Sequence, residues 1–132
     1  MPHVIRLRKP WMRSPAGVGE SVRVDVPDGS PPAGETCLVY TRRFNRPSGL
    51  TDADRVELIV SNWAGKLTAL VVNDQALPFD DVDADFADAG GRWDITDLLI
   101  PANFVTIELS RDGKALPCLN GDVRLRIVAE EL

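Results

Sequence analysis

The sequence predicts a single all-β domain over residues 1–132, a jelly-roll β-sandwich of eight or nine mainly antiparallel strands. Three observations lead to this fold class. The length of 132 residues suits one domain. Short segments alternate apolar with polar residues and are separated by glycine, proline, asparagine and aspartate, as in sandwiches. No segment shows the apolar periodicity of an amphipathic helix of useful length.

Eight segments have the alternation of strands, in which apolar residues recur at every second position. Ser21–Val26 shows the pattern, with three valines at alternate positions. Leu67–Val72 is apolar on both faces, which predicts a central strand covered twice. The predicted strands, in chain order, are Val4–Arg8, Ser21–Val26, Thr36–Phe44, Arg55–Trp63, Leu67–Val72, Arg92–Thr96, Phe104–Leu109 and Val123–Ala129.

Turn residues separate the predicted strands. Residues 27–34 are rich in proline and glycine, which interrupt a strand ladder, so this stretch is predicted to be a loop. Asn73 and Asp74 both tolerate a positive φ and predict a hairpin turn. Asp97–Ile100 allows at most one helical turn, because Pro101 ends it.

The charge is acidic overall and unevenly spread. Lys+Arg number 15 and Asp+Glu 20, which gives a net charge of −5. This balance argues against a dedicated nucleic-acid-binding protein, whose affinity comes mostly from neutralising phosphates. A basic group near the N-terminus comprises Arg6, Arg8, Lys9 and Arg13. We expect it to form the solvated face of a strand, with an anion site as the alternative.

Features of the chain also predict its compartment. No apolar run approaches the roughly 20 residues of a membrane span, and the N-terminus lacks the apolar stretch of a signal peptide. We therefore expect a soluble, cytoplasmic protein with no membrane partner, unless a leader has been removed. Cys37 and Cys118 are far apart and lack CxxC spacing, so free thiols are expected rather than a disulfide.

Three segments carry patterns that occur together in one family. Val39–Pro47 contains the pattern Tyr-x-Arg-x-Phe-x-x-Pro, and Val56–Asp74 contains an apolar strand that leads to Val-Val-Asn-Asp. The most specific segment, Trp93–Pro101, reads Trp-Asp-Ile-Thr-Asp-Leu-Leu-Ile-Pro and is followed by Asn103. In this order and spacing, the segments resemble the sugar-binding, galactose-binding-like domain of family 2 glycoside hydrolases, the group of β-galactosidases and β-glucuronidases.

The resemblance implies a galactose-binding-like jelly roll in a carbohydrate-related setting. The sequence departs from the family at Asp74 and at Ala102, where the family has glycine, and one residue fewer precedes Asn103. These departures alter loops and leave the scaffold intact. The catalytic barrel of the family, with its acid/base and nucleophile carboxylates, is not in this chain. The resemblance therefore carries over no catalytic residue.

The residues themselves also favour a protein that is not an enzyme. His3 is the one histidine, and it lies next to the N-terminus, so a positioned base for a Ser-His-Asp or Cys-His arrangement is not expected. The sequence contains no GxxxxGK[ST] or GxGxxG motif for a nucleotide. Aspartate is plentiful, so composition alone leaves a glycosidase carboxylate pair open.

One acidic stretch of the sequence is a candidate metal-binding site. Asp81, Asp83 and Asp85 match the first, third and fifth positions of an EF-hand loop, but Phe86 replaces the required glycine and Arg92 the final glutamate. The stretch is therefore not an EF-hand. We expect no cofactor and a solvated acidic loop here. The alternative, a structural calcium, comes from the resemblance, since many galactose-binding-like domains hold one.

The tryptophans are the natural candidates for a sugar platform, because an aromatic ring stacks on a pyranose while polar neighbours bind the hydroxyls. Trp93 is expected in the core. Trp63, with Asn62 and Lys66 beside it at a predicted hairpin tip, forms the main candidate sugar site, and Trp11 is the second candidate ring. The alternative for Trp63 is that its ring packs against a neighbouring loop, since large aromatic side chains mostly serve burial. The sequence thus predicts a non-catalytic carbohydrate-binding module. The alternative is a structural or protein-interaction jelly roll with no sugar affinity.

Overall fold

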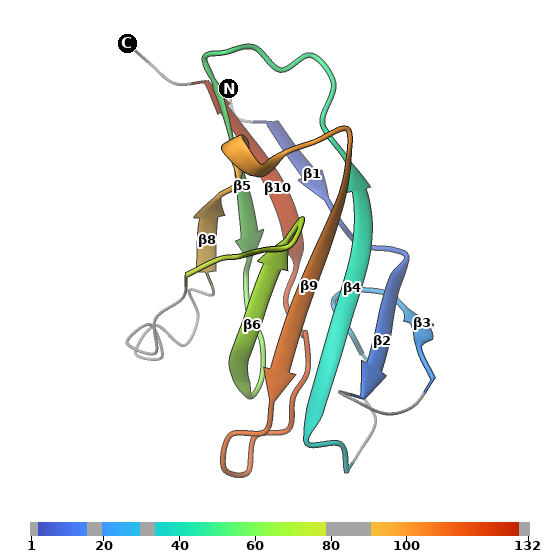
Figure 1. Ribbon diagram of the computed structural model, residues 1–132. Coiled ribbons are helices and arrows are strands. Elements are labelled where there is room, and N and C mark those ends of the chain that lie inside the picture. The colour runs from blue at the N-terminus through green and yellow to red at the C-terminus, as the bar shows by residue number, and fades with distance from the viewer. Residues whose placement is uncertain (1–2, 16–19, 30–33, 79–90, 130–132) are drawn as a thin grey trace.

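The computed structural model describes residues 3–15, 20–29, 34–78 and 91–129. Two antiparallel sheets face each other with the core between them (Figure 1). This arrangement confirms the predicted jelly-roll sandwich. The strand order is β1-β10-β5-β8 in one sheet and β3-β2-β4-β9-β6-β7 in the other. The strands are β1 (His3–Arg6), β2 (Trp11–Pro15), β3 (Val22–Val24), β4 (Cys37–Asn45), β5 (Asp54–Val60), β6 (Lys66–Val72), β7 (Gln75–Ala76), β8 (Gly91–Asp94), β9 (Ala102–Ser110) and β10 (Val123–Ala129).

All eight predicted segments overlap a strand, and Val123–Ala129 coincides with β10. The described residues contain ten strands rather than eight or nine, because the alternation rule misses β2 and β7. β2 follows Pro10 and ends at Pro15. Its nearly buried Arg13 occupies a position where the alternation rule expects an apolar residue. β7 has only two residues and completes the hairpin that turns at Asn73 and Asp74.

β6 is not the doubly covered central strand that its composition predicts. It lies second from the edge of the six-stranded sheet, between β9 and β7, and Ala69 and Val71 are half-buried on its outer face. A β-bulge between Leu67 and Ala69 shifts the register with β9. The bulge lets Leu67 and Leu70 both face the core although they are three positions apart.

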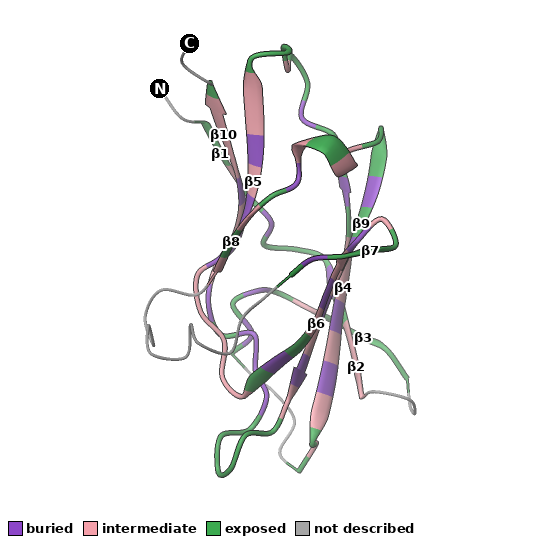
Figure 2. Cartoon of the chain, turned by 60° about the vertical axis from the view of Figure 1, so that its left-hand side comes forward, coloured by how far each residue is buried: buried purple, intermediate pink, exposed green. Residues whose placement is uncertain are grey.

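The core fills the space between the two sheets, as the burial colours show (Figure 2). Inward-facing residues alternate along the long strands β4, β5, β9 and β10, as expected for sheets that are covered on one face. The fully buried side chains at its centre are Leu38, Tyr40, Val56, Leu58, Val105, Ile107, Leu109, Val123 and Leu125.

The Asp-Ile-Thr-Asp-Leu-Leu string closes one end of the sandwich. Ile95 is fully buried, and the Asp94 carboxylate accepts hydrogen bonds from the backbone amide and the hydroxyl of Thr96, at 2.9 and 2.6 Å. The Thr96 hydroxyl oxygen in turn accepts a 2.8 Å bond from the Val56 amide of β5. The 3-10 helix η2 (Thr96–Leu98) is the single turn expected here. Within the described residues, no helix is long and apolar enough to span a membrane.

Two asparagines tie this end to the β6–β7 turn. Asn73 and Asp74 adopt φ values of 51° and 68°, which confirms the predicted hairpin turn. The Asn73 side-chain amide donates to Oδ1 of the buried Asn103 at 2.7 Å and to the Leu98 carbonyl at 2.9 Å. The same Asn103 oxygen accepts from the Ile100 amide at 2.9 Å, and its amide nitrogen donates to the Ile100 carbonyl at 2.8 Å.

Both cysteines are free thiols, as predicted. Cys118 is buried and Cys37 is half-buried. Burial raises the pKa of both thiols above the ordinary value, so both sulfurs remain protonated at neutral pH.

Candidate functional site

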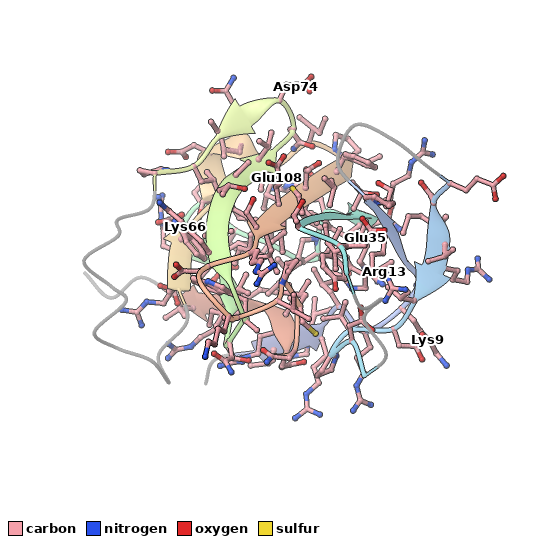
Figure 3. All side chains as sticks on the ribbon, turned by 90° about the horizontal axis from the view of Figure 1, so that it is seen from below. Lys9, Arg13, Glu35, Lys66, Asp74 and Glu108 are labelled. Carbon is pink, nitrogen blue, oxygen red and sulfur yellow. The ribbon has the colours of Figure 1, made fainter. Side chains whose placement is uncertain are left out.

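The predicted sugar site lies on the connection between β5 and β6, at one end of the sandwich. Ala64 in this connection exchanges backbone hydrogen bonds with Cys118, at 2.8 and 3.2 Å. The Ser61 amide donates to the Asp122 carbonyl at 2.8 Å. The loop between β9 and β10 therefore holds the connection in place along its length. Figure 3 views the molecule from below and labels Lys66, the residue with which β6 begins.

Two glycines allow this close packing. Gly65 adopts a φ of 86°, which L side chains rarely adopt, and a Cβ there would also collide with the Ser110 carbonyl oxygen. Gly121 is buried, and a Cβ on it would collide with the backbone of Asn62. The conformation of the candidate site thus depends on two positions that carry no side chain.

The connection is not the hairpin tip that the sequence predicts, because it crosses between the two sheets: Asn62 and Trp63 lie on it, and Lys66 begins β6. Trp63 is half-buried and packs against the core, Asn62 is half-buried, and Lys66 is exposed. Trp63 is therefore not a freely exposed ring. Part of its surface is held by the core and part reaches solvent, which leaves it available for a shallow stacking contact.

Trp11 was the second candidate ring, and the prediction is wrong for this residue. Its side chain is 0% exposed, and its indole Nε1–H donates a 2.7 Å hydrogen bond to the Leu7 carbonyl. A sugar cannot reach a ring that is enclosed by the core. Trp93 is half-buried against the core, close to the expectation, and its indole donates to the Pro78 carbonyl at 2.6 Å.

A buried polar cluster was missed by the sequence reasoning. Asp28 is buried, and its Oδ2 contacts Nη1 of Arg13 at 2.6 Å and accepts a 2.7 Å hydrogen bond from the Tyr40 hydroxyl. The Tyr40 oxygen in turn accepts from the Leu119 amide at 3.3 Å. Arg13 is thus not part of a solvated strand face, whereas Arg6 and Lys9 are exposed as expected. The position of Asp28 in a proline- and glycine-rich segment conceals this role.

The phenol of Tyr40 is expected to make stability depend on alkaline pH. Burial, and then the hydrogen bond donated to Asp28, raise the pKa of the Tyr40 phenol well above its ordinary value of 10.0. The unfolded chain can lose the phenolic proton near that value while the folded chain keeps it. The free energy of unfolding should therefore fall as the pH rises above about 10, by at most about 1.4 kcal/mol per pH unit from this group.

Tyr40 is the one tyrosine of the chain, so an ultraviolet titration of tyrosinate reports on this residue alone. The folded protein should show no tyrosinate until it unfolds. The Tyr40→Phe variant serves as the control and should lose the part of the alkaline slope that this group supplies. Ionisation near pH 10 in the folded state would contradict the assigned environment.

Arg42 belongs to the Tyr-x-Arg-x-Phe-x-x-Pro pattern and has an unusual environment. It lies on β4 at an alternate position with Leu38, Tyr40 and Phe44, so its side chain is on the core-facing side of the strand. Its Nε and Nη1 atoms are buried and have no hydrogen-bond partner, and burial lowers the pKa of its guanidinium. This side chain therefore adds an electrostatic cost to the fold.

The predicted metal site cannot be compared with the structure. Asp81, Asp83 and Asp85 lie outside the described residues. Among the residues that are described, no group of three or more His, Cys, Asp or Glu side chains is placed to hold a metal ion.

Solved structures with the same fold are glycoside hydrolases. An FMN-binding β-glucuronidase from Faecalibacterium prausnitzii L2-6 matches with a TM-score of 0.73 and 25% identity, over 98% of this chain. A Bifidobacterium dentium β-glucuronidase, complexed with coumarin-3-O-glucuronide, matches with a TM-score of 0.71 and 17% identity, over 97%. A β-D-mannosidase from Dictyoglomus thermophilum matches with a TM-score of 0.67 and 10% identity, over 93%. No protein-family model and no curated protein matches the chain.

These neighbours confirm, as a likeness of fold, the resemblance to the galactose-binding-like domain of family 2 glycoside hydrolases. The match takes in nearly all of this chain but only part of each enzyme. The chain spans 23%, 30% and 22% of the length of these three neighbours. The likeness therefore applies to one domain of each enzyme.

Proposed function

We propose that this chain is a non-catalytic carbohydrate-binding domain of the kind that accompanies the catalytic domain in family 2 glycoside hydrolases. The fold and the order of the three motifs support this proposal. The neighbours with this domain include β-glucuronidases and a β-mannosidase. The sequence and the geometry of the β5–β6 connection point to where a sugar would bind.

The half-buried Trp63, which follows Asn62 and precedes Lys66 by three residues in the chain, is the observation that carries the proposal. An indole held on one side by the core keeps a fixed orientation, so little rotamer freedom is lost when a sugar stacks on it. The Asn62 amide and the Lys66 ammonium supply hydrogen bonds suited to sugar hydroxyls. Loops on a rigid scaffold are common positions for such groups.

A non-catalytic role fits the titratable groups that the structure describes. His3 is exposed on β1, and the described residues offer it no arrangement with a nucleophile and an orienting carboxylate. The buried Asp28 is bonded to Arg13 and Tyr40, which suits structure rather than proton transfer.

The proposal predicts weak sugar binding that depends on Trp63. The unaltered chain should bind oligosaccharides on a glycan array with calcium present, and the best ligand should titrate with a Kd of about 0.1–1 mM. Trp63→Ala should weaken this binding at least tenfold. Its cost in unfolding free energy should be about 1–2 kcal/mol, because only part of the ring is buried.

The control is Met12→Ala, which removes an exposed side chain from the outer face of the six-stranded sheet. It should leave both sugar affinity and stability nearly unchanged. Unaltered affinity in a folded Trp63→Ala protein would remove this site from consideration. A folded chain that binds no oligosaccharide would refute the carbohydrate-binding role as a whole.

An alternative role as a protein-docking domain has its own support. The outer face of the six-stranded sheet carries an uncharged row across five strands, formed by cross-strand partners from β2 to β7. An uncharged row of side chains across a sheet suits packing against another protein layer. The members of this row are Met12, Thr41, Thr106, Val71 and Ala76.

A further inference from the structure

The outer face of the four-stranded sheet gathers arginines from all four of its strands. Side chains on this face come from alternate positions of β1, β10, β5 and β8, and the opposite positions fill the core. We call this surface the arginine face. Its arginines are Arg6, Arg55, Arg92, Arg124 and Arg126.

The arginine face has a charge opposite to that of the whole chain. Among the described strand residues of this face, only Glu57 and Asp94 are acidic, against five arginines. Asp94 is paired with Arg55 at 2.8 Å. Glu57 is shared, since its oxygens lie 3.5 Å from Arg92 and 3.6 Å from Arg126, so two carboxylates offset five guanidinium groups. The net charge of the whole chain is −5. A local excess of guanidinium groups on an acidic protein favours an anionic partner.

Two of these arginines oppose each other directly. Arg6 of β1 and Arg124 of β10 are cross-strand partners in the antiparallel register. Like charges directly opposite on one face destabilise a sheet. The Asp122 carboxylate lies 3.5 Å from Arg124 and partly offsets this repulsion. Both arginines face away from the core, so its packing does not require them.

We propose that the arginine face binds an acidic polysaccharide, a glycan whose chain bears carboxylate or sulfate groups. Guanidinium groups donate paired hydrogen bonds that match the geometry of both anions. Cross-strand pairing sets three arginines in one row across the sheet: Arg6 of β1, Arg124 of β10 and Arg92 of β8. Ile59 of β5 lies between Arg124 and Arg92. Such a row suits an extended, linear polyanion that lies across the strands. This surface is separate from the Asn62–Lys66 connection and goes beyond the function proposed above.

The composition of the face favours a glycan over other polyanions. Single-stranded nucleic acid is held by aromatic rings among the basic groups, and the described strand residues of this face include none. A protein partner would require buried apolar or aromatic anchors. Among the strand residues that the structure describes on this face, the uncharged outward ones are the aliphatic Val4, Ile59 and Val128.

The test is binding of the full chain to polygalacturonate, dextran sulfate and neutral dextran at low salt. The two acidic glycans distinguish carboxylate from sulfate as the recognised group, and at least one should bind while neutral dextran does not. Affinity should fall steeply with added salt. The double variant Arg6→Gln/Arg124→Gln should weaken binding at least tenfold and should change the melting temperature little, because it removes both the facing arginines and the weak Arg124–Asp122 pair.

The matched control, Arg23→Gln/Arg43→Gln, removes the same charge from exposed positions on the six-stranded sheet. It should retain most of the affinity, and Trp63→Ala should retain all of it. An equal loss in the two double variants would overturn the proposal, since binding would then follow net charge alone. Tighter binding of single-stranded DNA or polyglutamate than of either acidic glycan would also overturn it.

Discussion

Replacement of Asp28 by alanine is expected to lower the free energy of unfolding by about 3–5 kcal/mol, because it removes the carboxylate that the buried Arg13 guanidinium contacts. The side chains of Arg13 and Asp28 are only 12% and 3% exposed. The Tyr40 hydroxyl would lose its acceptor at the same time. Since a domain of this size has about 5–15 kcal/mol of stability in total, the variant should be marginally folded.

Urea unfolding followed by far-ultraviolet circular dichroism measures this loss. Asp28→Asn should cost less than Asp28→Ala, because the amide oxygen still accepts the bond from Tyr40. The control, Asp122→Asn, breaks a more exposed pair with Arg124, and its cost should stay below about 1 kcal/mol. A loss below about 1 kcal/mol for Asp28→Ala would mean that the cluster is not electrostatically coupled to the fold.

The strands could be predicted from the sequence because burial of one face imposes a period of two on their side chains. The pattern is clear in β10, where Val123 and Leu125 face the core and Arg124 and Arg126 face outward. The exceptions have physical causes. In β2 an inward position is filled by Arg13, which is bonded to Asp28, so apolar alternation fails there.

The motifs that carry the family resemblance serve the fold and are bonded internally. Asp94 and Thr96 bond each other and the backbone of β5, and Asn103 bonds Asn73 and the chain around Ile100. These groups have little capacity left for a ligand. The resemblance therefore predicts the architecture and does not specify a ligand.

The candidate site could be predicted only in part. The sequence predicts a hairpin tip at Asn62, Trp63 and Lys66, and this prediction is wrong, because β5 and β6 pair with other strands in different sheets. The three residues lie instead where the chain crosses from one sheet to the other. Whether a tryptophan near a strand end is buried depends on the opposite sheet, which no local pattern encodes. Trp11 and Trp63 look alike in the sequence, and the structure separates them by burial.

Trp11→Ala is accordingly expected to cost about 3–5 kcal/mol of unfolding free energy, the range for a large aromatic side chain removed from a core. The side chain is 0% exposed, so its deletion leaves a cavity between the sheets. The Leu7 carbonyl would also lose the hydrogen bond that the indole donates. Because Leu7 links β1 of one sheet to β2 of the other, both effects weaken the contact between the sheets.

Chemical denaturation of Trp11→Ala, Trp11→Phe and Trp63→Ala under one set of conditions tests this assignment. Trp11→Phe keeps a buried ring and loses the indole hydrogen bond, so it should cost less than Trp11→Ala. Trp63→Ala should cost least of the three, because its ring is only half-buried. If Trp63→Ala proved as damaging as Trp11→Ala, its ring would be part of the core, and loss of sugar binding in that variant could no longer be assigned to a stacking contact.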